Sequence, residues 1–164
     1  MTQEEKDHRP VAVLLYGLPG SGKSTYARHL AARGLVRLSV DDLMRRRHGR
    51  AGVDYPLDRH LDLLGPVVDD VYRQLASLLA TGRSVVLDHG LGRRCERDAV
   101  KRVVEEHGGH WRLVVFEADR PELVRRLAAR RPEDGFGPMS AEVLDAIART
   151  SEEPRGEGEE AATW

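Results

Sequence analysis

One glycine-rich segment constrains the fold of this 164-residue chain more than any other feature. Its spacing is G-x-x-x-x-G-K-[ST], the pattern of a phosphate-binding loop, or P-loop. An unbroken apolar run, Val11 to Tyr16, precedes it, and a stretch with helical periodicity follows. A strand buried on both faces, a glycine-rich turn and a helix start are the context in which such a loop folds. The segment reads Gly17-Leu18-Pro19-Gly20-Ser21-Gly22-Lys23-Ser24.

Each part of this motif has a role in binding a nucleoside triphosphate. Gly17, Gly20 and Gly22 are expected to take positive φ angles and to bring the backbone close to the phosphates. The loop amides and the helix N-terminus would form a concave positive surface. Lys23 is placed to reach the β- and γ-phosphates, and the Ser24 hydroxyl to ligate Mg²⁺. The expected cofactors are therefore ATP and Mg²⁺, and the expected nucleotide-binding residues are Gly17, Pro19, Gly20, Ser21, Gly22, Lys23, Ser24 and Thr25.

The rest of the sequence alternates between strand-like and helix-like segments. Alternation of this kind predicts an α/β, three-layer P-loop NTPase fold with a mostly parallel sheet of about four or five strands and a small helical lid. The expected strands are Val11 to Tyr16, Leu35 to Val40, Ser84 to Leu87 and Trp111 to Glu117. The expected helices are Ser24 to Arg33, Leu43 to His48, a long one with Pro66 as its first residue, Arg93 to His107, Pro121 to Arg131, and one capped by Ser140.

Composition sets the expected domain boundaries. Residues 11–150 are expected to form one kinase-like domain, with residues 1–10 as a flexible N-terminal tail. Residues 151–164 are rich in Glu, Gly, Pro and Ala. Because such a segment buries little apolar surface, a flexible acidic C-terminal tail is expected there.

Charge and hydropathy exclude several classes of protein. The net charge of −1 gives no general attraction to nucleic acid. No run of ~18 apolar residues is long enough to span a membrane. The N-terminus lacks the apolar stretch of a secretory signal, and Cys95 is the single cysteine. A cytoplasmic location is therefore expected.

The sequence also separates the classes of P-loop protein. It contains no asparagine, so the guanine-reading motif N-K-x-D is absent and a GTPase is disfavoured. Motor and AAA+ ATPases normally need larger domains with additional sensor elements. A kinase remains, and Asp41 and Asp42 follow the second expected strand, where ligands bind in a parallel sheet. Either aspartate could cap the next helix, and Asp41 could instead accept a proton from an attacking hydroxyl.

From about Val11 to about Ile147 the chain resembles the small P-loop kinases. That family includes the 5′-kinase domain of polynucleotide kinases, chloramphenicol phosphotransferase and the zeta toxins. Besides the P-loop, the matching segments are Asp41 after the second strand, Val85-Val86-Leu87-Asp88, the run Arg93, Arg94 and Glu96, and Pro121-Glu122-Leu123-Val124-Arg125-Arg126 followed by Arg130.

The resemblance implies roles for these residues. Asp41 would be the general base, and Asp88 would face the acceptor or act as an indirect partner of Mg²⁺. Arg126 and Arg130 would be lid arginines that close over the triphosphate and, with Lys23, neutralise charge in the transition state. Independently, their spacing of four puts Arg126 and Arg130 on one helix face, which would also suit a solvated helix. The prolines and glycines between Arg131 and Pro138 suit a hinge.

The chain departs from the polynucleotide kinase pattern at two positions. Met44 stands where that family has an arginine, with Arg45 one residue later, and Gly90 replaces an asparagine. These departures favour a small-molecule acceptor, with Asp41, Arg45, Asp88 and His89 as its expected contacts. The expected function is transfer of the γ-phosphoryl group to a hydroxyl of a metabolite, nucleoside or antibiotic. The alternatives are a polynucleotide 5′-hydroxyl kinase and an ATP-binding switch or partner module without an acceptor; the oligomeric state stays open.

Overall fold

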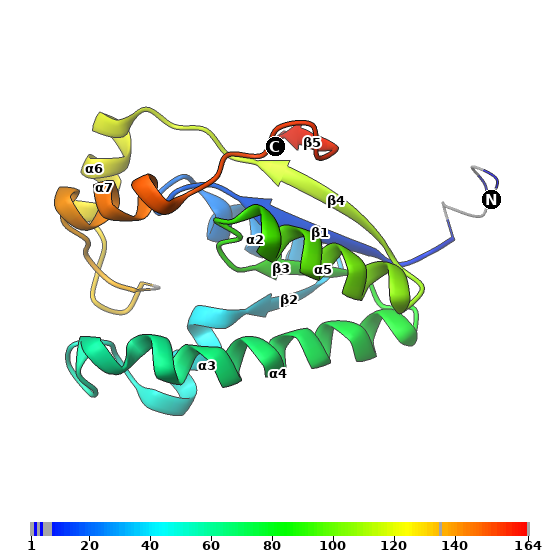
Figure 1. Ribbon diagram of the computed structural model, residues 1–164, viewed down its shortest axis with the longest axis horizontal. Helices are drawn as coiled ribbons and strands as arrows, with labels where there is room; N and C mark the ends of the chain where they lie inside the picture. The colour runs from blue at the N-terminus through cyan, green and yellow to red at the C-terminus, as the bar shows by residue number, and fades with distance from the viewer. Residues whose placement is uncertain (1, 3, 5–7, 135, 164) are drawn as a thin grey trace.

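A single parallel sheet organises the computed structural model, which describes residues 2, 4, 8–134 and 136–163 (Figure 1). The five strands of the described chain lie in the order β2-β3-β1-β4-β5. In chain order they are β1 (Val11–Tyr16), β2 (Val36–Ser39), β3 (Val85–Asp88), β4 (His110–Val115) and β5 (Glu159–Ala161). The helices are α2 (Lys23–Ala32), α3 (Val40–His48), the 3₁₀ turn η1 (Leu57–Arg59), α4 (His60–Ala80), α5 (Arg94–Glu106), α6 (Arg120–Ala128) and α7 (Ala141–Thr150).

The sheet forms the middle of three layers. On one face, alternate residues of β1 such as Leu14 pack with apolar residues of α3, α4 and α5. On the other face, Val13 and Leu15 pack with Tyr26 and Ala27 of α2. Because β1 is buried on both faces, its sequence reads as a continuous apolar run rather than an alternating one. The expected three-layer P-loop fold with a parallel sheet is confirmed.

Helices α6 and α7 form a small separate unit that we call the lid. Its core consists of Leu123, Leu127 and Leu144, which are almost fully buried. Ser140 caps α7 as the sequence predicted, since its Oγ accepts a hydrogen bond from the Val143 amide at 3.3 Å. Figure 1 shows the lid beyond the carboxyl ends of β1 and β4, at the end of the sheet where the P-loop also lies.

Helix α4 is longer than the sequence predicted. Pro66 was expected to be its first residue, but the helix begins at His60 and contains Pro66 in its interior. The buried stripe Val67, Val71, Leu75 and Leu79 packs against the sheet core, and this packing sustains the helix through the proline.

The C-terminal segment corrects the expectation of a flexible tail. Residues Glu159–Ala161 form β5, which pairs in parallel with β4, and the Ala162 amide donates to the Val115 carbonyl at 3.0 Å. Glu157 is buried in an ion pair with Arg97 of α5. This contact joins residues 60 positions apart, so local composition could not reveal it. The expected tail at residues 1–10 lies largely outside the described residues, although the Pro10 carbonyl accepts from the His110 amide at 3.0 Å.

Candidate active site

The P-loop connects β1 to α2 with the backbone geometry that its glycines permit. Gly20 has φ 85° and Gly22 has φ 104°, in the left-handed region that favours glycine. Gly17 does not have a positive φ, which corrects that part of the sequence prediction. Its role is close packing, because a Cβ there would lie 2.5 Å from Ser21 Oγ and 2.9 Å from Phe116 Cβ.

Lys23 folds back over the loop. Its Nζ donates hydrogen bonds to the carbonyl oxygens of Gly17 at 2.5 Å and Leu18 at 3.0 Å. Burial lowers the pKa of Lys23 to about 8, and the nearby Arg130 cation also lowers it, whereas Asp88 and Asp41 act in the opposite direction. An ammonium group held among carbonyls and partly deprived of water is suited to binding phosphate oxygens.

Ser24 and Asp88 meet at the end of the loop. Ser24 Oγ donates to Asp88 Oδ1 at 3.2 Å, and Asp88 is almost fully buried at the carboxyl end of β3. A hydroxyl beside a carboxylate offers two oxygen ligands, so the pair fits Mg²⁺ whose remaining ligands are phosphate oxygens and water. Among the described residues, no cluster of three or more His, Cys, Asp or Glu side chains could hold a metal by itself. Magnesium bound here would therefore depend on the nucleotide.

Arg37 holds the Asp88 carboxylate in place from the neighbouring strand. Its Nε and Nη2 donate to Asp88 Oδ2 at 3.0 and 2.5 Å, and its Nη1 donates to Asp42 Oδ2 at 2.6 Å. The register that pairs Ser39 with Asp88 brings the ends of β2 and β3 together. Ser39 is the actual cap of α3, since its Oγ accepts from the Asp42 amide at 3.2 Å.

A cavity of about 830 Å³ lies over the P-loop. Residues 20–25 form one wall, Val115, Phe116 and Glu117 follow from the end of β4, and the C-terminal segment closes the far side. The cavity is large enough for a complete nucleoside triphosphate. Within the described residues, the buried Ser21 Oγ has no hydrogen-bond partner, as expected of a group that awaits a ligand.

The lid brings Arg126 and Arg130 to this cavity. Both side chains line it, and Arg126 Nη1 donates to the Gly20 carbonyl oxygen at 3.0 Å while its Nε donates to Glu122 at 2.8 Å. Arg130 is half-buried, and this burial lowers its pKa, although Asp41 and Asp134 oppose the shift. Two guanidinium groups thus line this cavity. The expected helix through Arg131 is shorter, since α6 ends at Ala128, so Arg130 follows the helix and does not share one of its faces with Arg126.

Asp41 opens onto a second cavity of about 210 Å³. Its side chain is accessible through this cavity, but the surrounding walls limit its hydration and raise its pKa. The Asp88 carboxylate raises the pKa further, whereas His89 and His60 act in the opposite direction. The charge of Asp41 also acts on Lys23 and Arg130. Asp41 therefore lines the second cavity and is near enough to Lys23 and Arg130 to affect their pKa values.

Aromatic rings line much of the second cavity. Tyr55 stacks on His60, with ring centroids 5.9 Å apart and 9° between the ring planes, and its hydroxyl lies 2.7 Å from His60 Nδ1. Phe136, between α6 and α7, packs edge-on against His60, with the ring centroids 5.2 Å apart. Burial lowers the pKa of His60, so its ring is neutral at pH 7.

Of two residues expected to contact the acceptor, Arg45 lines the second cavity and His89 does not. Arg45 donates to the backbone carbonyl of Pro132 at 3.1 Å and to that of Glu133, so it ties α3 to the lid segment. His89 is half-buried next to Asp88, and burial lowers its pKa.

Sequence reasoning missed several residues of the site. Arg37 could have been identified from the sequence, because it is a charged residue between Val36 and Leu38 in a four-residue strand. His60 and Phe136 gave no such signal, because His60 begins α4, Phe136 lies between α6 and α7, and the two meet only in the folded chain. The part of the C-terminal wall formed by residues 159–162 was missed for the reason given above.

Comparisons with known proteins agree with this geometry. A family model described as an AAA domain, AAA_33, matches residues 13–154. The chain belongs to this family. The AAA description does not support the sequence argument that set AAA+ ATPases aside by length. No curated protein matches the sequence. In the described residues, no helix is long and apolar enough to cross a membrane.

Solved structures share the fold of this chain. A gluconokinase from Sinorhizobium meliloti 1021 has a TM-score of 0.61 and 22% identity, over 93% of this chain and 81% of that one. A chain of the Pnkp1/Rnl/Hen1 complex has a TM-score of 0.61 and 26% identity, but the match covers 73% of this chain and only 39% of that one. Kti12 of Chaetomium thermophilum, in complex with ADP-AlF3, has a TM-score of 0.68 and 18% identity, over 93% and 89%. The fold and the P-loop are thus those of the small P-loop kinases.

Proposed function

We propose that this protein is a kinase that transfers the γ-phosphoryl group of ATP, bound with Mg²⁺, to a hydroxyl of a small molecule. One observation carries the proposal: Asp41 lines the smaller cavity, and its charge acts on Lys23 and Arg130 at the phosphate end of the larger one. A general base must lie between the acceptor hydroxyl and the phosphate that it attacks.

The roles of the residues follow from their positions. Lys23 and the loop amides hold the phosphates, and Ser24, supported by Asp88, ligates Mg²⁺, which neutralises charge on the phosphate oxygens. Asp41 takes the proton of the acceptor hydroxyl as its oxygen bonds to the γ-phosphorus, and ADP leaves. The raised pKa of Asp41 makes it a stronger base than an ordinary aspartate. Arg126 and Arg130 stabilise the charge that develops.

The shape of the second cavity supports a small acceptor. Its volume of about 210 Å³ and its cover of lid residues leave room for one ring system rather than a polymer. Tyr55, His60 and Phe136 provide flat surfaces for a ring. Arg45 is engaged with lid carbonyls, and Arg50 lies 3.6 Å from the Asp54 carboxylate. Both cations therefore already have protein partners.

The similarity to a chain of the Pnkp1/Rnl/Hen1 complex favours a second candidate, a polynucleotide 5′-hydroxyl kinase. Such an acceptor requires cations free to bind backbone phosphates, and its binding weakens steeply with salt. Met44 in place of the family arginine reduces the support for this candidate. A nucleotide-dependent switch without an acceptor is a third candidate, because nucleotide binding at the P-loop does not by itself require an acceptor.

The deciding experiment is turnover of γ-labelled ATP against a panel of sugars, nucleosides, hydroxylated antibiotics and 5′-hydroxyl oligonucleotides, with Lys23→Ala as the control. Label on a small molecule, lost in the control, is the expected result. Label on an oligonucleotide end would establish the second candidate instead. Nucleotide binding that alters partner affinity, without label on any acceptor, would identify a switch.

A further inference from the structure

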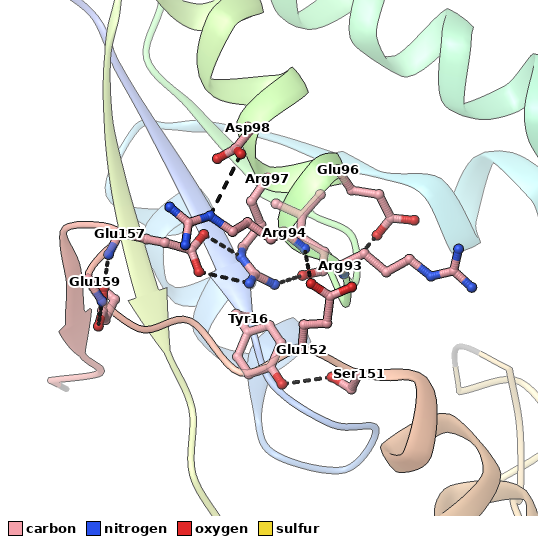
Figure 2. Close-up of polar contacts among 12 residues, drawn as sticks. Tyr16, Arg93, Arg94, Glu96, Arg97, Asp98, Ser151, Glu152, Glu157 and Glu159 are labelled. Atoms are coloured by element: carbon pink, nitrogen blue, oxygen red, sulfur yellow. Dashed lines mark hydrogen bonds and ion pairs between the residues drawn. The ribbon is translucent and has the colours of Figure 1, made fainter.

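A buried cluster of charged residues fastens the C-terminal segment to α5. Arg97 Nε and Nη2 donate to the two carboxylate oxygens of Glu157, each at 2.9 Å, and Arg97 Nη1 donates to the Leu91 carbonyl at 2.8 Å. Figure 2 shows Glu157 reaching Arg97 from the segment that follows α7. Lys101 Nζ donates to the backbone carbonyl of Glu157 at 2.9 Å. The side chains of Arg97 and Glu157 are 0% and 2% exposed.

Two aromatic rings complete this cluster. The Arg97 guanidinium lies over the Tyr16 ring, 5.2 Å from its centroid, and Lys101 Nζ lies 4.2 Å from that of Trp111. Tyr16 is the last residue before the P-loop, and its hydroxyl lies 2.7 Å from Ser151 Oγ (Figure 2). The cluster therefore connects α5, the end of β1 and the C-terminal segment.

Other contacts also attach the segment at both ends: the Glu152 amide donates to the Gly92 carbonyl at 2.7 Å, and Ala162 packs against the sheet core. Strand β5 is three residues long, mostly exposed, and pairs only with β4 at the edge of the sheet. Its sequence, Glu159-Glu160-Ala161, buries almost no apolar surface. Because a buried charge is strongly destabilised when it loses its partner, loss of the Glu157–Arg97 pair should loosen the middle of the segment even though its ends are held.

The segment is also a wall of the nucleotide cavity. Glu153 and Pro154 line the cavity on one side of Glu157 in sequence, and residues 159–162 line it on the other. Glu157 itself does not line it, since its side chain is turned toward α5. Carboxylates on this wall repel phosphate, whereas Lys23, Arg126 and Arg130 at the opposite end attract it. The uncharged nucleoside part of the donor therefore fits the C-terminal wall better than its phosphates do.

We propose that Arg97, Lys101 and Glu157 are positioning residues that fix the nucleoside-binding wall. They set the affinity for the base and ribose of the donor and not for its phosphates. This inference rests on the nucleotide-binding part of the proposed function, but it does not depend on the identity of the acceptor. A positioning role can be told apart from a general loss of stability. A general loss of stability would weaken the binding of every ligand, whereas a positioning role affects only ligands that contain a nucleoside.

The test compares two ligands that share their phosphates, AMPPNP and inorganic tripolyphosphate, each titrated by calorimetry with Mg²⁺. Glu157→Gln keeps the side-chain shape but leaves two buried cations unpaired, and it should weaken AMPPNP binding by about tenfold or more. Tripolyphosphate binding should change by less than about twofold, since the P-loop is intact. Arg94→Gln is the matched control, because it removes the exposed pair of Arg94 with Asp98 on the same helix as Arg97 and should change neither affinity.

A second variant keeps the test decisive if Glu157→Gln does not fold. Lys101→Met retains the apolar contact with Trp111 and the Arg97–Glu157 pair, but removes the bond to the Glu157 carbonyl. It should lower AMPPNP affinity selectively, by about threefold or more. Equal losses for both ligands, or no loss for either, in the folded variant would overturn the inference. Wild-type protein that binds neither ligand would instead overturn the proposed function.

Discussion

Arg126 donates a hydrogen bond from Nη1 to the carbonyl oxygen of Gly20, 3.0 Å away, and so joins the lid to the P-loop across 106 residues. Arg125, its neighbour on α6, shares the ion pair with Glu122 but is directed into solvent. We expect Arg126→Ala to weaken ATP binding by about tenfold, because a charge-assisted contact beside the phosphates is lost. Arg125→Ala loses the same Glu122 pairing and should bind ATP like wild type in calorimetry. Equal effects of the two variants would contradict a lid role for Arg126.

Asp41→Asn should leave ATP affinity within about twofold of wild type but lower kcat for transfer by about 10²-fold or more, because asparagine cannot accept the proton. The measurement is steady-state transfer to the acceptor that the labelling panel identifies. Asp42→Asn is the control, since Asp42 is half-exposed and pairs with Arg37 rather than facing the acceptor cavity. Full transfer by Asp41→Asn would exclude this residue as the base.

Nucleotide binding should depend on the ionisation of Lys23. Its pKa of about 8 in the free protein rises when phosphates bind, so the protonated form binds ATP more tightly. ATP affinity should therefore be constant below about pH 8 and fall by up to about tenfold per pH unit above it, until the pKa of the bound state is reached. Calorimetry between about pH 7 and 9.5 measures this slope. Lys23→Arg stays charged over this range, and a slope that persists in it would assign the titration to another group.

Arg37→Met should destabilise the fold by about 2 kcal/mol, because it leaves the buried Asp88 carboxylate without its cation. Urea unfolding in the absence of nucleotide measures the change in the free energy of unfolding. Arg47→Met breaks the exposed pair with Asp70 and should cost no more than about 0.5 kcal/mol. Similar values for the two variants would mean that the Arg37–Asp88 pair contributes no more than a surface pair.

The parts of this site that the sequence predicted are those set by local structure. The P-loop was identifiable because its glycines, Lys23 and Ser24 are contiguous and follow a buried strand. Asp41 was identifiable because it directly follows β2, and parallel strands end at one edge of the sheet. Arg126 and Arg130 were identifiable from the family resemblance, although α6 ends at Ala128 and no helix face carries both.

The parts that were missed depend on contacts between distant segments. Strand β5 lacks an apolar pattern, and its position depends on pairing with β4 and on the burial of Glu157 against Arg97. The start of α4 at His60 was hidden by Pro66, which ordinarily marks the beginning of a helix. The ring cluster of Tyr55, His60 and Phe136 forms only when the lid lies against the N-terminus of α4.

The segment between α6 and α7 borders both cavities. Arg130 lines the nucleotide cavity, and Pro132, Phe136 and Pro138 line the cavity beside Asp41. Each ligand that orders this segment reduces the entropy loss on binding of the other, so the two affinities are linked by one reciprocal factor. Under the proposed function, the donor and the acceptor would each favour binding of the other, so linkage through one short segment would bring the two substrates to the site together.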